Sequence, residues 1–281
     1  MRIEIEGATC IECERCVRVC PSEIFINSCS GIPTIQNIDL CIKCGHCVAI
    51  CHTDSIFHEI FPPDKVHTFD KKELPTSEQL MLLFKARRSG RVFTKDPVPE
   101  YLIDQIVEAA HRAPTASNSQ KVYFKVITDP DQLQMISDFT VQTFKKLACF
   151  LNFPLIKPFL KILAPDLVKY IPAFYEMEKE YKAGKDMILR GATAVIFMYS
   201  PQNQFYGSAE CNLAYQNGSL MAETLGIAQF YTGFVLTALE RDKRGVLYKS
   251  MGIKGVVHAG MALGVSPFHF PKYIDRKEVI R

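Results

Sequence analysis

Eight cysteines near the N-terminus stand in two runs with the same spacing. The first run is Cys10, Cys13, Cys16 and Cys20, and the second is Cys41, Cys44, Cys47 and Cys51. Thiolates are the side chains that hold iron–sulfur clusters. Three thiolates at two-residue intervals on a tight loop reach three corners of one cube, and the fourth, at the start of a helix, points toward a second cube. These residues therefore predict electron transfer through two cubane clusters.

The spacing C-x2-C-x2-C-x3-C is that of bacterial two-cluster ferredoxins, in which the fourth cysteine of each run binds the other cluster. Pro21 follows the first run as in that motif, whereas His52 follows the second. A disulfide framework would need an oxidising compartment, and a zinc site usually separates its two ligand pairs by a longer stretch, so both fit less well. We assign Cys10, Cys13, Cys16 and Cys51 to cluster one, and Cys41, Cys44, Cys47 and Cys20 to cluster two.

Three further cysteines lie outside these runs. Cys29 stands between them, and Cys149 and Cys211 lie far along the chain. Free cysteine behaves as a small apolar side chain and is among the most buried residue types. We therefore expect all three to be buried and none to bind a cluster.

Short elements must position the two cysteine runs. Residues 2–6 alternate like a strand, residues 32–35 and 55–60 resemble return strands, and a short helix flanks each cluster. This order predicts a pseudo-twofold βαββαβ domain of the bacterial ferredoxin type over residues 1–61. Because so small a domain buries little apolar surface, its clusters would stabilise it.

Charge is distributed unevenly along the 281-residue chain. Residues 1–60 carry eight acidic and four basic side chains, whereas residues 61–281 carry 22 acidic and 29 basic ones. The basic body suits an anionic cofactor or substrate, or a solvated basic surface. A net charge of +3 is too small to indicate nucleic-acid binding. Without an apolar signal core or a spanning stretch, we expect a cytoplasmic protein with no stable membrane insertion.

A linker and a larger domain follow. Residues 62–76 begin with two prolines and stay polar, which is typical of a linker, and the second domain is expected over residues 77–281. A helix begins near Ser77. Further helices are expected at about 99–112, 130–147, 209–225 and 237–250, and strands at about 122–128, 193–199, 227–231 and 256–264. The order indicates an α+β fold with helices around a central sheet. Neither a Rossmann G-x-G-x-x-G nor a P-loop motif occurs.

Three short segments of this domain stand out. They are Arg87-Arg88-Ser89-Gly90-Arg91, the loop Ala-Pro-Thr-Ala-Ser-Asn-Ser-Gln at 113–120, and Gly-Ile-Ala-Gln-Phe-Tyr-Thr-Gly at 226–233. In this order and spacing they resemble the nitroreductase family of FMN enzymes. The whole chain is similar to the members of that family that carry an N-terminal two-cluster ferredoxin domain. The resemblance implies a nitroreductase-like fold, bound FMN and a homodimer, since family members bind FMN at a dimer interface.

The resemblance also implies roles for the basic segment. Arg87 and Arg88 would bind the FMN phosphate, because guanidinium donors match phosphate oxygens in pairs. Ser89 would donate to the phosphate or the ribityl chain. Arg91 would lie near N1 and O2 of the flavin, where a cation stabilises the reduced ring. Taken by themselves, these arginines also fit an ordinary helix C-terminus.

Other matching residues would surround the flavin ring. The resemblance places Asn118 at its O4/N3 edge and the backbone of Thr232 and Gly233 near N5. The neighbouring subunit would contribute Pro114, Thr115 and Ala116. Lys272 and Arg276 in the tail would add phosphate contacts or belong to a solvated tail. The sequence departs from the family after Gln120, where Lys121-Val122 replaces the frequent Pro-Trp, which bears on substrate range.

A long apolar segment with four prolines occupies about residues 150–185. It fits a lid that builds an apolar pocket over the flavin. It also fits a helical insertion packed on the body or at the dimer interface. A third interpretation is a membrane-surface helix interrupted by its prolines.

Together these features predict an FMN-dependent, nitroreductase-like oxidoreductase. Electrons from an external donor such as ferredoxin would pass through the clusters to FMN, which would reduce a small nitro-aromatic, quinone or activated alkene. Because the cofactor carries this chemistry, no side chain is assigned as a catalytic acid or base. One alternative is an enzyme that oxidises NAD(P)H and delivers electrons out through the clusters. Another is a non-catalytic electron-transfer or interaction protein.

Overall fold

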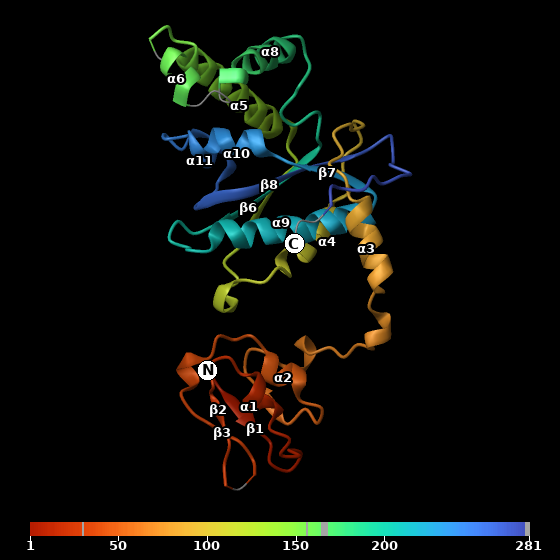
Figure 1. The fold of residues 1–281 in the computed structure, drawn as a ribbon. Coiled ribbons are helices and arrows are strands. Elements are labelled where there is room, and N and C mark those ends of the chain that lie inside the picture. Colours follow the sequence, from red (N-terminus) through yellow and green to blue (C-terminus); the bar gives the residue numbers. More distant parts are fainter. Residues whose placement is uncertain (30, 156, 164–167, 279–281) are drawn as a thin grey trace. The chain divides into compact units, whose positions relative to one another are not determined.

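The computed structural model describes residues 1–29, 31–155, 157–163 and 168–278 (Figure 1). The chain divides into two compact units, one of Met1–Thr76 with Thr115–Ser119, and one of Ser77–Pro114 with Gln120–Arg281. Within the described ranges, no helix is both long enough and apolar enough to cross a bilayer.

The first unit is built from two small antiparallel strand pairs and two short helices. Strand β1 (Ile3–Ile5) pairs with β4 (Ile56–His58), and β2 (Phe25–Ile26) pairs with β3 (Thr34–Ile35). Helices α1 (Arg15–Val19) and α2 (His46–Ile50) each contain the third cysteine of a run. The fourth cysteine, expected at the start of a helix, instead follows the end of each one. The buried core consists of Ile3, Ile24, Phe25, Cys47 and Ile56. Partly buried side chains pack against it: Ile5, Cys16, Val17, Cys20, Ile35, Ile38, Cys41, Val48 and Cys51.

The expectation that Cys29 is buried is wrong, because its side chain is exposed. Cys29 stands in the connection between β2 and β3, outside the small core of this unit. The stretch from Pro62 to Thr76 contains two single 3₁₀ turns, at Pro63–Lys65 and Lys71–Glu73.

A four-stranded antiparallel sheet in the order β5-β6-β8-β7 forms the centre of the second unit. Its strands are β5 (Tyr123–Ile127), β6 (Ala194–Ser200), β7 (Ile227–Tyr231) and β8 (Val256–Val265). All four lie within a residue or two of the expected positions. The register between β6 and β8 shifts between Met198 and Tyr199.

Helices cover both faces of this sheet, because side chains of the central strands alternate between two apolar cores. Ala194, Ile196 and Met198 of β6 pack with helices α4 (Glu100–His111) and α9 (Gly207–Thr224). Val195 and Phe197 face the opposite way. The elements on that side are α5 (Pro130–Leu151), α8 (Ile171–Lys182), α10 (Gly233–Glu240) and α11 (Val246–Met251).

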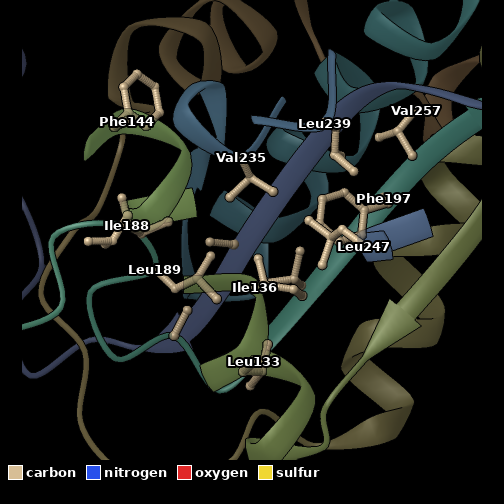
Figure 2. Packing of buried hydrophobic residues seen from close by; sticks show 14 of the residues in the cluster. Leu133, Ile136, Phe144, Ile188, Leu189, Phe197, Val235, Leu239, Leu247 and Val257 are labelled. Carbon is tan, nitrogen blue, oxygen red and sulfur yellow. The ribbon is translucent and has the colours of Figure 1, made fainter. Parts of the chain in front are cut away.

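Figure 2 shows this second core, in which aliphatic side chains from α5, α10 and α11 surround Phe197. Its buried members include Ile136, Val235 and Leu247. Burial of a large aliphatic side chain contributes about 1.5–3 kcal/mol, so the sheet and the helices form a rigid support for the segments that leave the strand ends.

The single helix expected at 237–250 is wrong, because the structure has α10 and α11 separated by a turn. Gly245 adopts the left-handed φ of 63°. The carboxylate of Asp242 accepts the main-chain N–H groups of Val246 (2.9 Å) and Leu247 (2.7 Å), which caps α11. Residues 240–245 (Glu-Arg-Asp-Lys-Arg-Gly) carry no apolar side chain, and this polar run ending in glycine was the available signal of the break.

Two further helices lie in the described part of the second unit. Helix α3 (Ser77–Ala86) precedes the arginine segment, and α6 (Lys157–Leu163) lies inside the proline-rich stretch. Cys211 is buried as expected, whereas the same expectation for Cys149 is wrong. Cys149 lies on the solvent side of α5, next to the buried Ala148, and its Sγ accepts from the Tyr175 hydroxyl at 3.8 Å.

Candidate functional site

The cysteines of the first unit line two separate cavities. One is lined by Cys10, Cys13, Cys16 and Cys51, together with apolar side chains such as Ile5 and Ile56. The other is lined by Cys20, Cys41, Cys44 and Cys47. Each cavity thus gathers three thiols of one run and the fourth thiol of the other run, which are the two sets assigned from the spacing.

This donor set fits iron–sulfur clusters in its chemistry. Four thiols surround each cavity, and thiolate is the ligand of such clusters. In the described part of the chain, no three His, Cys, Asp or Glu side chains converge closely enough to hold a single metal ion. A cubane spreads its four ligand thiolates over a larger space than one ion does.

Hydrogen bonds and burial shift the pKa values of individual thiols. Burial raises the pKa of Cys47 to about 11. Burial also acts to raise the pKa of Cys51, but hydrogen bonds from Thr53 and Ser55 outweigh it and leave that pKa lowered. The main-chain N–H of Ser55 donates to Cys51 Sγ at 3.3 Å, and that of Lys43 donates to Cys41 Sγ at 3.4 Å.

His58 also lines the second cavity, and the sequence did not single it out. It is 1% exposed, and its Nε2 lies 3.8 Å from Cys41 Sγ. Burial lowers the pKa of this imidazole. The sequence signal for His58 was its position in the strand. It lies two residues after Ile56, on the same buried face of β4, where an apolar side chain is expected.

In the second unit, the arginine segment follows directly after α3 and lies against α9 and β7. The main-chain N–H of Arg88 donates to Glu223 Oε2 of α9 at 3.3 Å. The carbonyl of Arg88 accepts from Gln229 Nε2 of β7 at 3.4 Å. A Cβ at Gly90 would come 2.8 Å from the Cβ of Ala228, so only glycine lets the segment approach the strand this closely.

Aromatic side chains complete this arrangement. The guanidinium Cζ of Arg91 lies 5.9 Å from the centre of the Phe230 ring, a cation–π distance. The hydroxyl of Tyr215 donates to Gln229 Oε1 at 2.6 Å. Burial raises the pKa of Tyr215, although Arg87 and Arg91 act to lower it. The phenol therefore stays a neutral donor beside two cations.

Glu223, Gln229 and Tyr215 were not predicted as site residues. Gln229 is 1% exposed in a strand of apolar neighbours. A buried amide must find hydrogen-bond partners, so a glutamine inside an apolar strand was the signal that could have found this network. Its partners lie on α9 and in the arginine segment, and sequence spacing does not identify them.

The end of β7 supplies a polar atom without a protein partner. Thr232 is 2% exposed, and among the described residues its Oγ1 is the buried side-chain atom that makes no hydrogen bond. Next to it, a Cβ at Gly233 would meet nothing within 4 Å. A buried hydroxyl without a protein partner, one residue past the strand that carries Gln229 and Phe230, fits a polar cofactor such as FMN.

The remaining predicted residues are more dispersed. Thr115, Ala116 and Asn118 belong to the first unit, where Asn118 Nδ2 donates to the carbonyl oxygens of Lys43 (2.7 Å) and Ile42 (3.4 Å). Pro114 is exposed and belongs to the second unit.

Residues of the C-terminal tail line a cavity beside the arginine segment. Ser266 and Phe268 line a cavity of about 130 Å³ with Arg88, Gly90 and Glu223. Lys272 and Arg276, expected as phosphate ligands, are exposed and do not line this cavity.

Comparison with protein families identifies both parts of the chain. The nitroreductase family profile matches residues 84–265. The chain belongs to the nitroreductase family. A 4Fe-4S dicluster domain profile matches residues 9–56. The nitroreductase-like α+β fold and the ferredoxin-type 4Fe-4S domain expected from the sequence are therefore confirmed.

Solved nitroreductases share the fold of this family member. The structure of a nitroreductase with bound FMN from Bacteroides fragilis is 16% identical with a TM-score of 0.55, over 72% of this chain and 97% of that chain. A nitroreductase with bound FMN from Desulfitobacterium hafniense is 20% identical with a TM-score of 0.55, over 72% and 96%.

Curated relatives match over short segments. An NADH dehydrogenase of Thermus thermophilus is 54% identical over 44 residues, 16% of this chain and 22% of that protein. Iodotyrosine deiodinase 1 of Rattus norvegicus is 34% identical over 62 residues, 22% of each. The chain thus spans about a fifth of the length of the curated relatives it matches.

Proposed function

We propose that this nitroreductase-family protein is an iron–sulfur flavoprotein oxidoreductase. Two [4Fe–4S] clusters in the first unit receive single electrons from an external donor and pass them to FMN in the second unit, which reduces a small organic acceptor. The observation that carries this proposal is the sorting of eight cysteines around two cavities, each completed by the fourth thiol of the other run.

The clusters are assigned to the first unit on two grounds. Cys10, Cys13, Cys16 and Cys51 hold cluster one, and Cys41, Cys44, Cys47 and Cys20 hold cluster two. The element order β1-α1-β2-β3-α2-β4 supports the pseudo-twofold βαββαβ arrangement. Because the buried core of this unit is so small, cluster binding contributes a large part of its stability.

FMN is assigned to the edge of the second unit formed by the arginine segment and β7. When bound, FMN exchanges electrons singly or as a hydride, which the side chains themselves cannot do. Arg87, Arg88 and Ser89 bind its phosphate end. Arg91 holds a positive charge near the ring, stacked on Phe230, and Thr232 Oγ1 gains the hydrogen bond that it lacks within the protein.

The remaining contacts come from loops and from a second copy of the chain. Asn118 binds the polar ring edge, and Lys272 and Arg276 approach the phosphate from the tail. In a homodimer the partner contributes Pro114, Thr115 and Ala116. Exposed apolar residues on α3 support such an interface, since Met81 and Leu82 are 53% and 54% exposed in the single chain.

The acceptor is a small nitro-aromatic, quinone or activated alkene bound over the flavin under the proline-rich stretch of residues 150–185. One contact next to this stretch supports a lid role for it. Phe144 of α5, the helix that leads into it, packs edge-on against Phe234 with ring centres 5.3 Å apart. Phe234 follows Gly233, the residue assigned to the flavin N5 region. An apolar cover there would exclude water from the reacting groups.

One observation favours a second candidate function. A relative of this chain carries the name NADH dehydrogenase, and NAD(P)H oxidation at the flavin with electrons leaving through the clusters uses the same cofactors. Steady-state assays with NADH, NADPH and a reduced ferredoxin as donors decide between the two directions.

The cofactor content of the purified protein tests the proposal without an activity assay. Anaerobically purified protein is expected to contain about eight iron and eight sulfide ions per chain, as two [4Fe–4S] clusters hold, and about one FMN. Iron without flavin would leave a non-catalytic electron carrier. Flavin without iron would contradict the electron path.

A further inference from the structure

His58 is the last residue of β4. Together with Ser55, it is one of the buried polar side chains in the described part of the first unit. It pairs with Ile3 across the strand ladder and is 1% exposed. Its ring packs on Phe61 with centres 4.8 Å apart. This packing holds the imidazole in one orientation, with Nε2 directed at the cavity of cluster two.

The proton position on this ring follows from its two neighbours. The main-chain N–H of Ile60 donates to His58 Nδ1 at 3.2 Å, so Nδ1 is an acceptor and carries no hydrogen. A neutral imidazole with a free Nδ1 carries its proton on Nε2. That nitrogen lies 3.8 Å from Cys41 Sγ, within reach of an N–H···S hydrogen bond.

We infer that His58 is a positioning residue that raises the reduction potential of cluster two by donating an Nε2–H···Sγ hydrogen bond to Cys41. The inference rests on the proposed assignment of Cys41 to that cluster. Hydrogen bonds to cluster sulfurs are one of the levers that set its potential. Reduction adds a negative charge that a donor stabilises more than the oxidised form, so the bond favours the reduced state.

The two proposed clusters differ in the kind of side-chain donor, an imidazole at Cys41 and a hydroxyl at Cys51. Cys41 and Cys51 each accept a main-chain N–H, from Lys43 and Ser55. Cys51 also lies 3.7 Å from the Thr53 hydroxyl, which contacts Ser55 as well. The imidazole is the additional donor of Cys41, and it is buried where water does not compete for its proton.

A redox titration of the full-length holoprotein, followed by electron paramagnetic resonance, tests this inference with three variants. His58→Leu removes the donor. The reduction equilibrium of one cluster is expected to shift about tenfold toward the oxidised form, which lowers its midpoint potential by ~59 mV for one electron. His58→Gln keeps an N–H donor and is expected to stay within about threefold of the parent. His67→Leu, which removes an exposed histidine of the linker, is the matched control and is expected to leave both midpoints in place.

A second measurement covers the case in which His58→Leu fails to assemble. Because His46 and His52 also line the two cavities, ¹⁵N-labelled histidine is placed in a variant with His46→Gln and His52→Gln. After reduction, electron–nuclear double resonance is expected to detect a histidine nitrogen coupled to one cluster. Protein with its full iron content but with no such coupling, or with equal midpoints in His58→Leu and the parent, overturns the role of His58. Protein without cluster iron instead overturns the proposed function.

Discussion

At the scale of single residues, main-chain hydrogen bonds hold the arginine segment in place, and under the proposed function the guanidinium groups of Arg87 and Arg88 bind the FMN phosphate. Glu223 and Gln229 bond the N–H and the carbonyl of Arg88, and the approach at Gly90 fixes the segment against β7. Because the backbone is anchored independently of the guanidinium groups, removing one of them should change ligand affinity more than folding.

Arg87→Ala is therefore expected to weaken FMN binding. A hydrogen bond to a charged group contributes about 1.5–3 kcal/mol, so Kd for FMN should rise roughly 10- to 150-fold, measured by fluorescence titration of flavin-depleted protein. Arg244→Ala, which removes an exposed arginine from the α10–α11 turn, is the control. Equal affinities in the two variants would contradict the phosphate assignment.

Gly233→Ala separates a cofactor contact from a folding requirement. The added Cβ meets no protein atom within 4 Å and the backbone is outside the left-handed region, so alanine at this helix start should leave stability unchanged or raise it by about 0.4–1 kcal/mol. If the flavin lies there, overpacking should weaken its binding by about 1–3 kcal/mol. Thermal unfolding and FMN titration are the measurements. Unchanged FMN affinity would place the ring elsewhere.

At this scale the sequence revealed the residues whose chemistry depends on type and spacing. The two cysteine sets follow from a repeated interval, and the structure gathers them around two cavities. Cys29 and Cys149 belong to no pattern, so only a general tendency to burial applied, and both are exposed. His58 and Gln229 act through partners that are distant in sequence, which spacing cannot indicate.

At the scale of elements, strands were more predictable than helix boundaries. β7 has the expected limits, because its apolar run is bounded by Gly226 and Thr232. The break between α10 and α11 was missed, although Asp242, which caps the second helix, lies in a run of six residues without an apolar side chain. A polar run that ends in glycine is typical of a turn.

The proline-rich stretch gives a prediction about the acceptor site. Ile162 and Leu163 of α6 are 81% and 80% exposed in the single chain, so replacing them with glutamine should change the free energy of unfolding by no more than about 0.5 kcal/mol. If α6 covers the acceptor, KM for apolar quinones should rise several-fold while flavin reduction through the clusters stays unchanged.

The control for this prediction is Phe205→Gln, at an 89% exposed position just before α9. KM values that are the same in the α6 variants, this control and the parent would exclude a lid role. The stretch would then cover a subunit interface or a membrane surface, the other two interpretations of its apolar composition.

At the scale of the whole molecule, we propose that one unit carries single electrons and the other performs two-electron chemistry. Under the proposed function, the first unit holds one-electron carriers in an acidic sequence, and the second holds the flavin in a basic one. FMN can take up electrons singly and deliver them in pairs, so the fusion lets a one-electron donor drive two-electron reduction. The central claim is therefore that electrons pass from the clusters to FMN.

The most direct test follows both cofactors in the anaerobic full-length protein. A low-potential one-electron reductant is mixed with the oxidised holoprotein, and cluster and flavin absorbance are recorded in a stopped-flow instrument. We predict that flavin absorbance is lost as the clusters turn over, and that Cys41→Ala, which breaks cluster two, slows this loss more than tenfold. Flavin that stays oxidised while the clusters remain reduced would contradict the account.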